Sequence, residues 1–167
     1  NKEVHLERHL ESPRFDYLAP AYTDEDVALR NAGITLPIMV MSPEENNYYF
    51  LFRHQLEPEI YSFSTLQKLI ENIEHYSSFI PLPVQIHIKF DSGMHRLGFT
   101  EIDKKSLFSI LNENKNSVHI ASVFSHFTSS DDASENSFTE LQLNRFKKFS
   151  ADLENAIQYP ILKHISN

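Results

Sequence analysis

The feature that most constrains the fold of this chain is the alternation of short apolar runs with amphipathic stretches along its 167 residues. The apolar runs have the length of strands, and the stretches between them carry apolar side chains at helical spacing. One strand and one helix recur at roughly 20 to 35 residues per unit, which is typical of parallel strands joined by helical crossovers. The predicted strands cover residues 16–21, 37–41, 57–62, 84–90, 118–125 and 161–165. The predicted helices cover residues 24–32, 64–77, 103–114 and 137–156, and a further helix is expected to begin at Ser42-Pro43, with proline in its first position.

This rhythm predicts an α/β fold, and it leaves an open doubly wound sheet and a (β/α)8 barrel both possible. Glycine is scarce, since the chain holds only Gly33, Gly93 and Gly98. No glycine-rich loop follows a predicted strand, which argues against a dinucleotide or P-loop site.

Composition excludes several other classes of protein. Fifteen lysine and arginine residues oppose 23 aspartate and glutamate residues, so the net charge of -8 argues against nucleic acid binding. The chain has no cysteine, which excludes disulfides, thiolate metal sites and cysteine nucleophiles. No apolar run is long enough to span a bilayer, so no membrane partner is expected. The first residue is not Met and the last segment is the apolar run ILKHISN, so we expect a fragment of a longer protein.

Residues 84–90 form the most informative predicted strand, because polar and apolar side chains alternate strictly along it. One interpretation is an antiparallel edge strand with its polar face in water. The other is a barrel strand whose polar face points inward, where a buried charge must be paired or modified. The pattern alone favours neither. The apolar face comprises Val84, Ile86, Ile88 and Phe90, and the polar face comprises Gln85, His87, Lys89 and Asp91.

Two candidate site residues follow predicted strands at their carboxyl ends, where barrel enzymes build their active sites. Arg96 lies in the loop DSGMHRLG, and an arginine there can bind oxygen atoms as a two-pronged donor, although loop arginines are also common on surfaces. His126 ends the strand predicted over residues 118–125 and suits a base, a ligand or a stacking platform. Asp131 and Asp132 are nearby, but no second histidine stands at metal-ligand spacing, so no metal site is expected.

Five segments of the chain, in order, resemble segments of the alanine racemase family. This resemblance implies a partial (β/α)8 TIM-type barrel, containing about strands 2 to 6 with their helices. Residues 1–167 would then be an incomplete pyridoxal-phosphate-binding barrel domain, with the first strand and the C-terminal β-domain absent. The segments are DYLAPAYTDEDVALRNAGITLPIMVMSPE, IHIKFDSGMHRLGF, VFSHFTSSDD, FTELQLNRF and ILKHISN.

The same resemblance implies roles for individual residues. Lys89 matches a barrel lysine that is often carbamylated (N6-carboxylysine) and could then pair with Arg96. Arg96 matches an arginine that contacts the cofactor and the substrate carboxylate, and His126 matches the histidine stacked on the cofactor ring. His164 matches a histidine that supports the site from behind, and Asn167 precedes the phosphate-binding serine of the family.

Asp91, which directly follows the strand carrying the lysine, is expected to support the site in the same way as that second histidine. Two departures from the family pattern are Ser92, where threonine is usual, and Phe127-Thr128, which are bulkier than the usual residues.

The implied function is that of a homodimeric, cytoplasmic isomerase that supplies D-alanine for peptidoglycan. It would interconvert L- and D-alanine through a pyridoxal 5'-phosphate imine by two-base proton transfer. The imine lysine and the tyrosine base would lie outside this chain, so no catalytic base is assigned to it and the fragment alone is expected to be inactive. The alternatives are a non-catalytic pyridoxal-phosphate-binding barrel protein and a racemase of another small amino acid.

Overall fold

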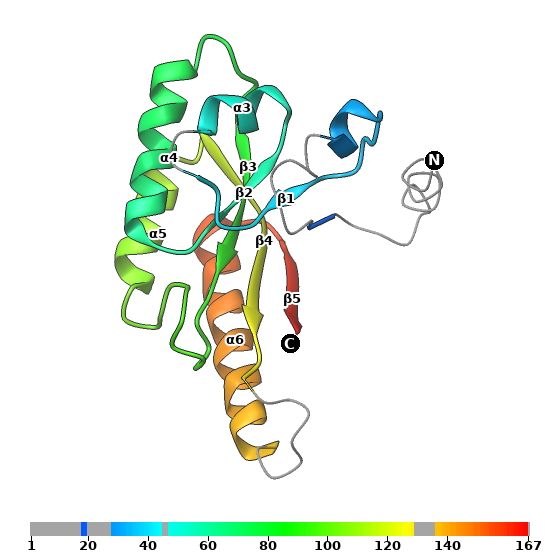
Figure 1. Cartoon of the computed structure of the whole chain (residues 1–167). Helices are drawn as coiled ribbons and strands as arrows, with labels where there is room; N and C mark the ends of the chain where they lie inside the picture. The colour runs from blue at the N-terminus through cyan, green and yellow to red at the C-terminus, as the bar shows by residue number, and fades with distance from the viewer. Residues whose placement is uncertain (1–17, 20–27, 45–46, 129–135, 167) are drawn as a thin grey trace.

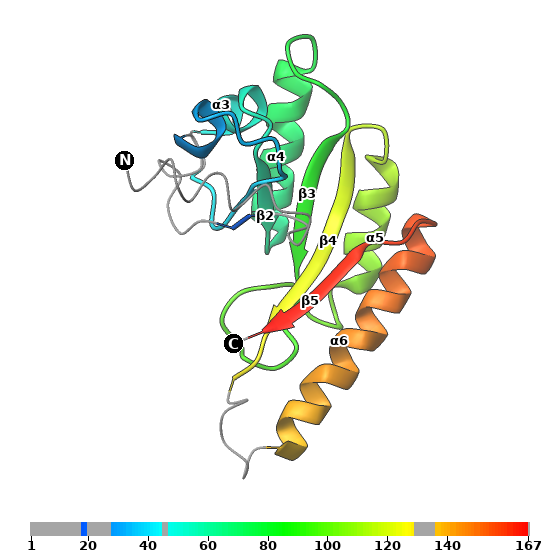
Figure 2. The same ribbon diagram turned by 90° about the vertical axis from the view of Figure 1, so that its right-hand side faces the viewer.

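The chain forms a five-stranded parallel sheet that curls into a half-barrel (Figures 1 and 2). The structure is a computed structural model, and it describes residues 18–19, 28–44, 47–128 and 136–166. The strands lie side by side in chain order, without the reversal that marks a doubly wound sheet. The predicted partial barrel is therefore confirmed. The strands are β1 (Met39–Val40), β2 (Glu57–Ile60), β3 (Val84–Lys89), β4 (Val118–His126) and β5 (Leu162–Ser166).

Helices cover one face of the sheet and leave the other face lined by strands (Figures 1 and 2). The long helices α4 (Phe63–Tyr76), α5 (Lys104–Glu113) and α6 (Asn136–Ile157) each connect two neighbouring strands. The shorter α3 (Tyr48–Arg53) connects β1 to β2. The predicted crossover helices over residues 64–77, 103–114 and 137–156 agree with these bounds to within one residue at each end.

The hydrophobic core lies between the sheet and its covering helices. Phe149 of α6 stacks on Phe90 with ring centroids 4.1 Å apart. The ring of Phe108 of α5 lies 5.8 Å from the ring of Phe149, centroid to centroid. Leu66 and Leu69 of α4 are likewise buried. Each such side chain contributes about 1.5–3 kcal/mol by leaving water. The core therefore fixes which face of each strand points toward the helices, and the other face is left to polar side chains.

The start of α4 carries a reciprocal cap, which the prediction from apolar spacing did not use. Ser62 Oγ accepts from the backbone N–H of Thr65, and Thr65 Oγ1 accepts from the backbone N–H of Ser62. Two N–H groups that the helix leaves unpaired are thereby satisfied. This reciprocal cap depends only on residues three positions apart, so it can be read from the sequence.

The helix predicted to begin at Ser42-Pro43 is a wrong prediction. The described helix α3 begins at Tyr48, after Asn47. Ser42 instead adopts a left-handed backbone with φ of 47°, and its backbone N–H donates to a carboxylate oxygen of Glu59 on β2 at 2.7 Å. A long-range contact has overridden the local capping signal.

The first predicted strand and helix are described only in part. Leu18 pairs in parallel with Ile38, in agreement with a strand over residues 16–21 beside β1. Residues 28–31 are helical, in agreement with the end of the helix predicted over residues 24–32. The remaining residues of both segments lie outside the described part of the chain.

A bulge in the pairing of β3 with β4 decides which side chains meet inside the half-barrel. Ile86 pairs with Ile120, but His87 pairs with Ser122, so Ala121 is an extra residue on β4. The extra residue shifts the side-chain alternation of β4 by one position. As a result Ser122 points to the same side as His87, and the sheet presents a continuous row of polar side chains on its concave face.

Candidate functional site

The candidate site lies where β3 and β4 end, beside the loop that joins β3 to α5. Phe90 and Phe99 pair across the base of this loop, through Phe99 N–H to Lys89 O at 2.9 Å and Asp91 N–H to Phe99 O at 2.8 Å. Gly98 makes the closure possible, since it has φ of 127° and a Cβ there would lie 2.7 Å from the backbone nitrogen of Asp91. Glycine is the residue that tolerates both the conformation and the close approach.

Asp91 shapes the first turn of the loop. Its Oδ1 accepts from the backbone N–H of Gly93 at 2.9 Å and from that of His95 at 3.0 Å. His95 takes a left-handed backbone with φ of 58°. An aspartate that binds its own downstream backbone fixes a turn, so Asp91 positions the segment that carries Arg96.

A buried glutamine on α6 holds the ends of both strands together. Gln142 Nε2 donates to Ser92 Oγ at 3.3 Å and to His126 O at 3.4 Å, and Gln142 Oε1 accepts from Thr128 N–H at 3.2 Å. Ser125 Oγ donates to Ser92 Oγ at 2.9 Å. A buried amide with several partners has one favoured orientation. Gln142 therefore couples the position of His126 to the position of the β3–α5 loop.

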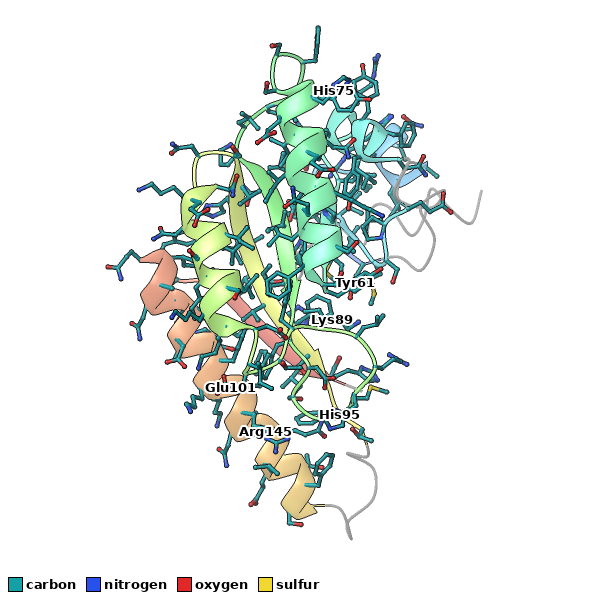
Figure 3. All side chains as sticks on the ribbon, turned by 90° about the vertical axis from the view of Figure 1, so that its left-hand side faces the viewer. Tyr61, His75, Lys89, His95, Glu101 and Arg145 are labelled. Carbon is teal, nitrogen blue, oxygen red and sulfur yellow. The ribbon has the colours of Figure 1, made fainter. Side chains whose placement is uncertain are left out.

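Arg145 adds a second contact from α6 to this loop. Its Nη1 donates to Ser92 O at 3.2 Å. Figure 3 labels Lys89, His95 and Arg145 and shows the loop leaving β3 at Lys89 and descending past His95 beside α6. The loop is thus held at its base and along α6, while its outer part remains exposed.

Arg96 and His126 both line a small pocket at this edge, together with Lys89, Asp91 and Ser125. Arg96 is exposed and makes no hydrogen bond or ion pair with another described residue, and the ring of His126 is half-buried. An unpaired guanidinium beside an accessible imidazole suits an anionic, ring-containing ligand, because arginine binds oxygen anions and flat rings stack on one another. The residue types present therefore fit a phosphorylated pyridine such as pyridoxal phosphate.

Behind this edge, the concave face of the sheet carries a buried chain of polar contacts. His87 Nε2 lies 2.9 Å from Glu57 Oε2, and His87 Nδ1 lies 2.7 Å from Ser122 Oγ. His87 and Ser122 are buried, so substrate cannot reach the serine hydroxyl as it would in a hydrolase triad. The chain serves to satisfy polar groups inside the half-barrel.

Lys89 forms a second buried contact one layer nearer the site. Its Nζ lies 2.8 Å from Glu59 Oε1, and both side chains are almost fully buried. The polar face of residues 84–90 is thus internal, and the edge-strand interpretation is wrong, since β3 is the central strand. The pairing expected with Arg96 is that of a carbamylated Lys89 and stays a prediction, whereas the unmodified Lys89 of this structure contacts Glu59.

His164 of β5 closes the row of inward side chains. Its ring stacks on Phe124 with centroids 5.0 Å apart and an angle of 6° between the planes. Burial, and next the charge repulsion from His87, lower the pKa of His164 to about 4. His164 is therefore neutral at physiological pH, as suits a half-buried ring that stacks on Phe124. Asn167, the remaining predicted site residue, lies outside the described residues.

A larger cavity of about 230 Å³ opens at the opposite, amino-terminal edge of the sheet. The guanidinium of Arg30, which lines it, already donates to the carbonyl oxygens of Ile34, Leu36, His54 and Gln55. Because this cation is committed to the backbone, the cavity lacks the open charge found at the carboxyl edge. The smaller pocket is the better candidate despite its size.

Within the described ranges, no group of three or more histidine, cysteine or acidic side chains is placed to hold a metal ion. Over the same residues, every helix is too short or too polar to cross a membrane. Sequence reasoning missed Glu59 and Gln142. Glu59 alternates with apolar residues in its strand just as Lys89 does, and Gln142 interrupts a helical stripe of aromatic and aliphatic residues.

Comparison with known proteins identifies relatives over most of the chain. The family model described as "Alanine racemase, N-terminal domain" matches residues 4–167. A curated alanine racemase of Methanococcus maripaludis is 35% identical over 159 residues, which cover 91% of this chain and 40% of the relative. One of Neisseria meningitidis serogroup C is 34% identical over 143 residues, covering 83% of this chain and 38% of the relative.

The fold has the same relatives. A solved alanine racemase of Clostridium difficile 630 superposes with a TM-score of 0.81 and 31% sequence identity, covering 99% of this chain and 42% of that chain. The chain thus spans about 40% of the length of the curated relatives that it matches.

Proposed function

Because this chain belongs to the alanine racemase family, as its match to the N-terminal domain shows, we propose that it contributes to a pyridoxal-phosphate-dependent racemase. The proposed reaction interconverts L- and D-alanine and supplies D-alanine for peptidoglycan. The observation that carries the proposal is that Arg96, which has no partner among the described residues, lines one pocket with His126 at the carboxyl edge of the half-barrel. That is the edge at which barrel enzymes bind their ligands.

In this proposal the chain's own residues bind and orient the cofactor. Arg96 donates to an oxygen of the cofactor ring and to the substrate carboxylate, and His126 provides a flat surface for the ring. Asp91 keeps the Arg96 loop in one conformation through its two backbone contacts. His164 supports the pocket from β5, and Asn167 is proposed to lie near the cofactor phosphate.

Bound pyridoxal phosphate would supply an electron sink for the negative charge that remains when a substrate loses its α-proton. The two bases that remove and return this proton are assigned to other parts of a full-length racemase. No residue of this chain is given a proton-transfer role, and the chain alone is expected to be inactive. A homodimer in the cytoplasm is part of the same proposal.

The proposal is tested by incubating the full-length protein with L-alanine and pyridoxal phosphate in deuterium oxide. The expected result is D-alanine carrying deuterium at the α-carbon, detected by chiral chromatography and NMR, with no product when the cofactor is omitted. Cofactor binding without any α-hydrogen exchange would replace the enzyme with a non-catalytic binding protein. Faster exchange with serine than with alanine would replace the substrate with another small amino acid.

A further inference from the structure

The cavity at the amino-terminal edge of the sheet has the volume and the walls to hold a small ring. Its volume is about 230 Å³, whereas a cavity of about 150 Å³ is enough to hold benzene. Most of its lining is apolar, and an apolar lining with a few polar groups is typical of small-molecule sites. The apolar wall comprises Pro37, Phe52, Leu56, Pro81, Pro83 and Val84. A ligand with a flat apolar body can pack against this wall.

The charged groups of the lining favour an uncharged ligand. Arg30 and Glu57 are the charged residues that line the cavity. All three guanidinium nitrogens of Arg30 already donate to backbone carbonyl oxygens, so the cavity offers little to an anion. Burial lowers the pKa of Arg30 and the negative charge of Glu57 raises it, so the two opposite charges act on each other. A cationic ligand would face the charge of Arg30, and an uncharged one disturbs neither group.

Glu57 and Gln85 supply the polar groups that remain open to a ligand. Glu57 Oε2 lies 2.9 Å from Nε2 of the buried His87. Among the described residues, none donates a hydrogen bond to the other oxygen, Oε1, and the Glu57 side chain is 13% exposed. Gln85 is half-buried in the same lining, and its side chain has no hydrogen bond with another described residue. The pair thus offers a charged acceptor and an amide donor.

We propose that this cavity binds a small uncharged ligand that has a flat apolar body and an amide or amino group. The N–H of the ligand donates to Glu57 Oε1, and Gln85 donates to the carbonyl or ring acceptor of the ligand. The body of the ligand packs against the proline rings and Phe52. The proposal involves neither Arg96 nor His126, so it does not depend on the proposed racemase activity.

The test titrates the full-length protein with four probes of nearly the same shape, followed by ligand-detected NMR. Benzamide is the uncharged amide, benzoate is an anion, and benzamidinium is a cation. Acetophenone replaces the amide N–H donor by a methyl group. Benzamide is expected to bind most tightly, and roughly 10-fold or more above acetophenone, because it adds a hydrogen bond to a charged acceptor.

Variants locate the binding within the molecule. Thr35→Phe adds a ring at an exposed position of the lining and should abolish benzamide binding. Asn144→Phe, at an exposed position of α6 outside the lining, is the matched control and should bind as the wild type does. Only binding that Thr35→Phe removes is assigned to the cavity. Glu57→Gln keeps the size of the side chain but removes its charge, so the preference for benzamide over acetophenone should fall roughly 10-fold.

Each part of the proposal can fail separately. If Thr35→Phe removes no probe binding, the cavity is not a ligand site. Equal affinities of benzamide and acetophenone would overturn the role of Glu57 as acceptor, and tighter binding of benzoate or benzamidinium at the cavity would overturn the choice of an uncharged ligand. The comparison among the four probes uses the wild-type protein, so it decides the ligand class even if Glu57→Gln does not fold.

Discussion

The buried concave face of the half-barrel and the exposed loop at its carboxyl edge both carry a cationic side chain. The buried cation is paired within the fold, and the exposed cation is not paired with a described residue. Inside, Lys89 has its own carboxylate within 2.8 Å. At the edge, Arg96 is exposed and has no partner among the described residues, and it stands on a loop fixed by Asp91. A buried charge must be neutralised within the fold, whereas an exposed charge is solvated by water and stays available to a ligand. The difference separates a residue that maintains structure from one that is free to bind.

The largest effect is expected from Lys89→Met, which leaves Glu59 buried without its cation. Removing one partner of a buried ion pair destabilises by about 3–5 kcal/mol, so the urea midpoint should fall strongly. Arg96→Met is the matched control, because that side chain is exposed and its loss should change stability by less than about 0.5 kcal/mol. Equal losses for the two variants would remove the distinction between the two regions.

A smaller loss of stability is expected from Gln142→Ala, which tests the contact between α6 and the carboxyl edge of the half-barrel. The change removes the hydrogen bonds to Ser92, to His126 O and to Thr128 N–H and leaves a cavity, at a cost of about 1–3 kcal/mol. The NMR signals of the His126 ring should shift as well. Asn144→Ala, an exposed position on the same helix, should leave both stability and these signals unchanged. Unaltered His126 signals in Gln142→Ala would contradict the coupling.

The sequence-based expectations succeeded for features that depend on neighbouring residues and failed for contacts between distant parts of the chain. The alternation along residues 84–90 correctly placed Lys89 on the polar face of a strand, because alternation is a local property, but it left open whether that face is buried or in water. The partner Glu59 was missed, because it depends on how β2 aligns with β3, and this register is set by the whole sheet. Helix α4 was predicted from the spacing of its own apolar residues, whereas the contact of Ser42 with Glu59 displaced a helix start that looked equally good locally.

The candidate site shows the same limit. Arg96 and His126 were predicted from their positions after strands, and the structure brings both to one pocket. Gln142 was not predicted, since its helix was read only for its apolar positions. A polar residue in the same helical stripe as Phe138 and Phe146 is a signal that could have identified it. Its partners on two different loops could be known only from the fold.

Arg96→Ala should weaken cofactor binding without unfolding the full-length protein. A charge-assisted hydrogen bond contributes about 1.5–3 kcal/mol, so the Kd for pyridoxal phosphate should rise about 10- to 100-fold. Absorbance titration at several cofactor concentrations measures this change. Arg53→Ala on α3 is the control and should bind as the wild type does. Arg96→Lys separates charge from geometry, since lysine keeps the charge but lacks the two-pronged donor. Wild-type affinity in Arg96→Ala would exclude Arg96 from the site.

The smallest effect on stability is expected at His164, on the last strand of the half-barrel. Burial is the main cause that lowers the pKa of His164 to about 4, and the charge of His87 is the second. A histidine whose folded pKa lies below its unfolded value of about 6.5 binds more protons when the chain is unfolded. Stability should therefore decline as the pH falls from about 6.5 to about 4, and this contribution should level off below that range. Because His164 is only half-buried, solvent screening reduces the expected change to about 1–2 kcal/mol.

His164→Phe keeps a ring against Phe124 but cannot titrate, so its stability should fall less over the same pH range in urea unfolding. His95→Asn, at an exposed position, should follow the wild-type curve. Parallel pH profiles for His164→Phe and the wild type would show that the inner row, like the loop at its edge, leaves this histidine open to water.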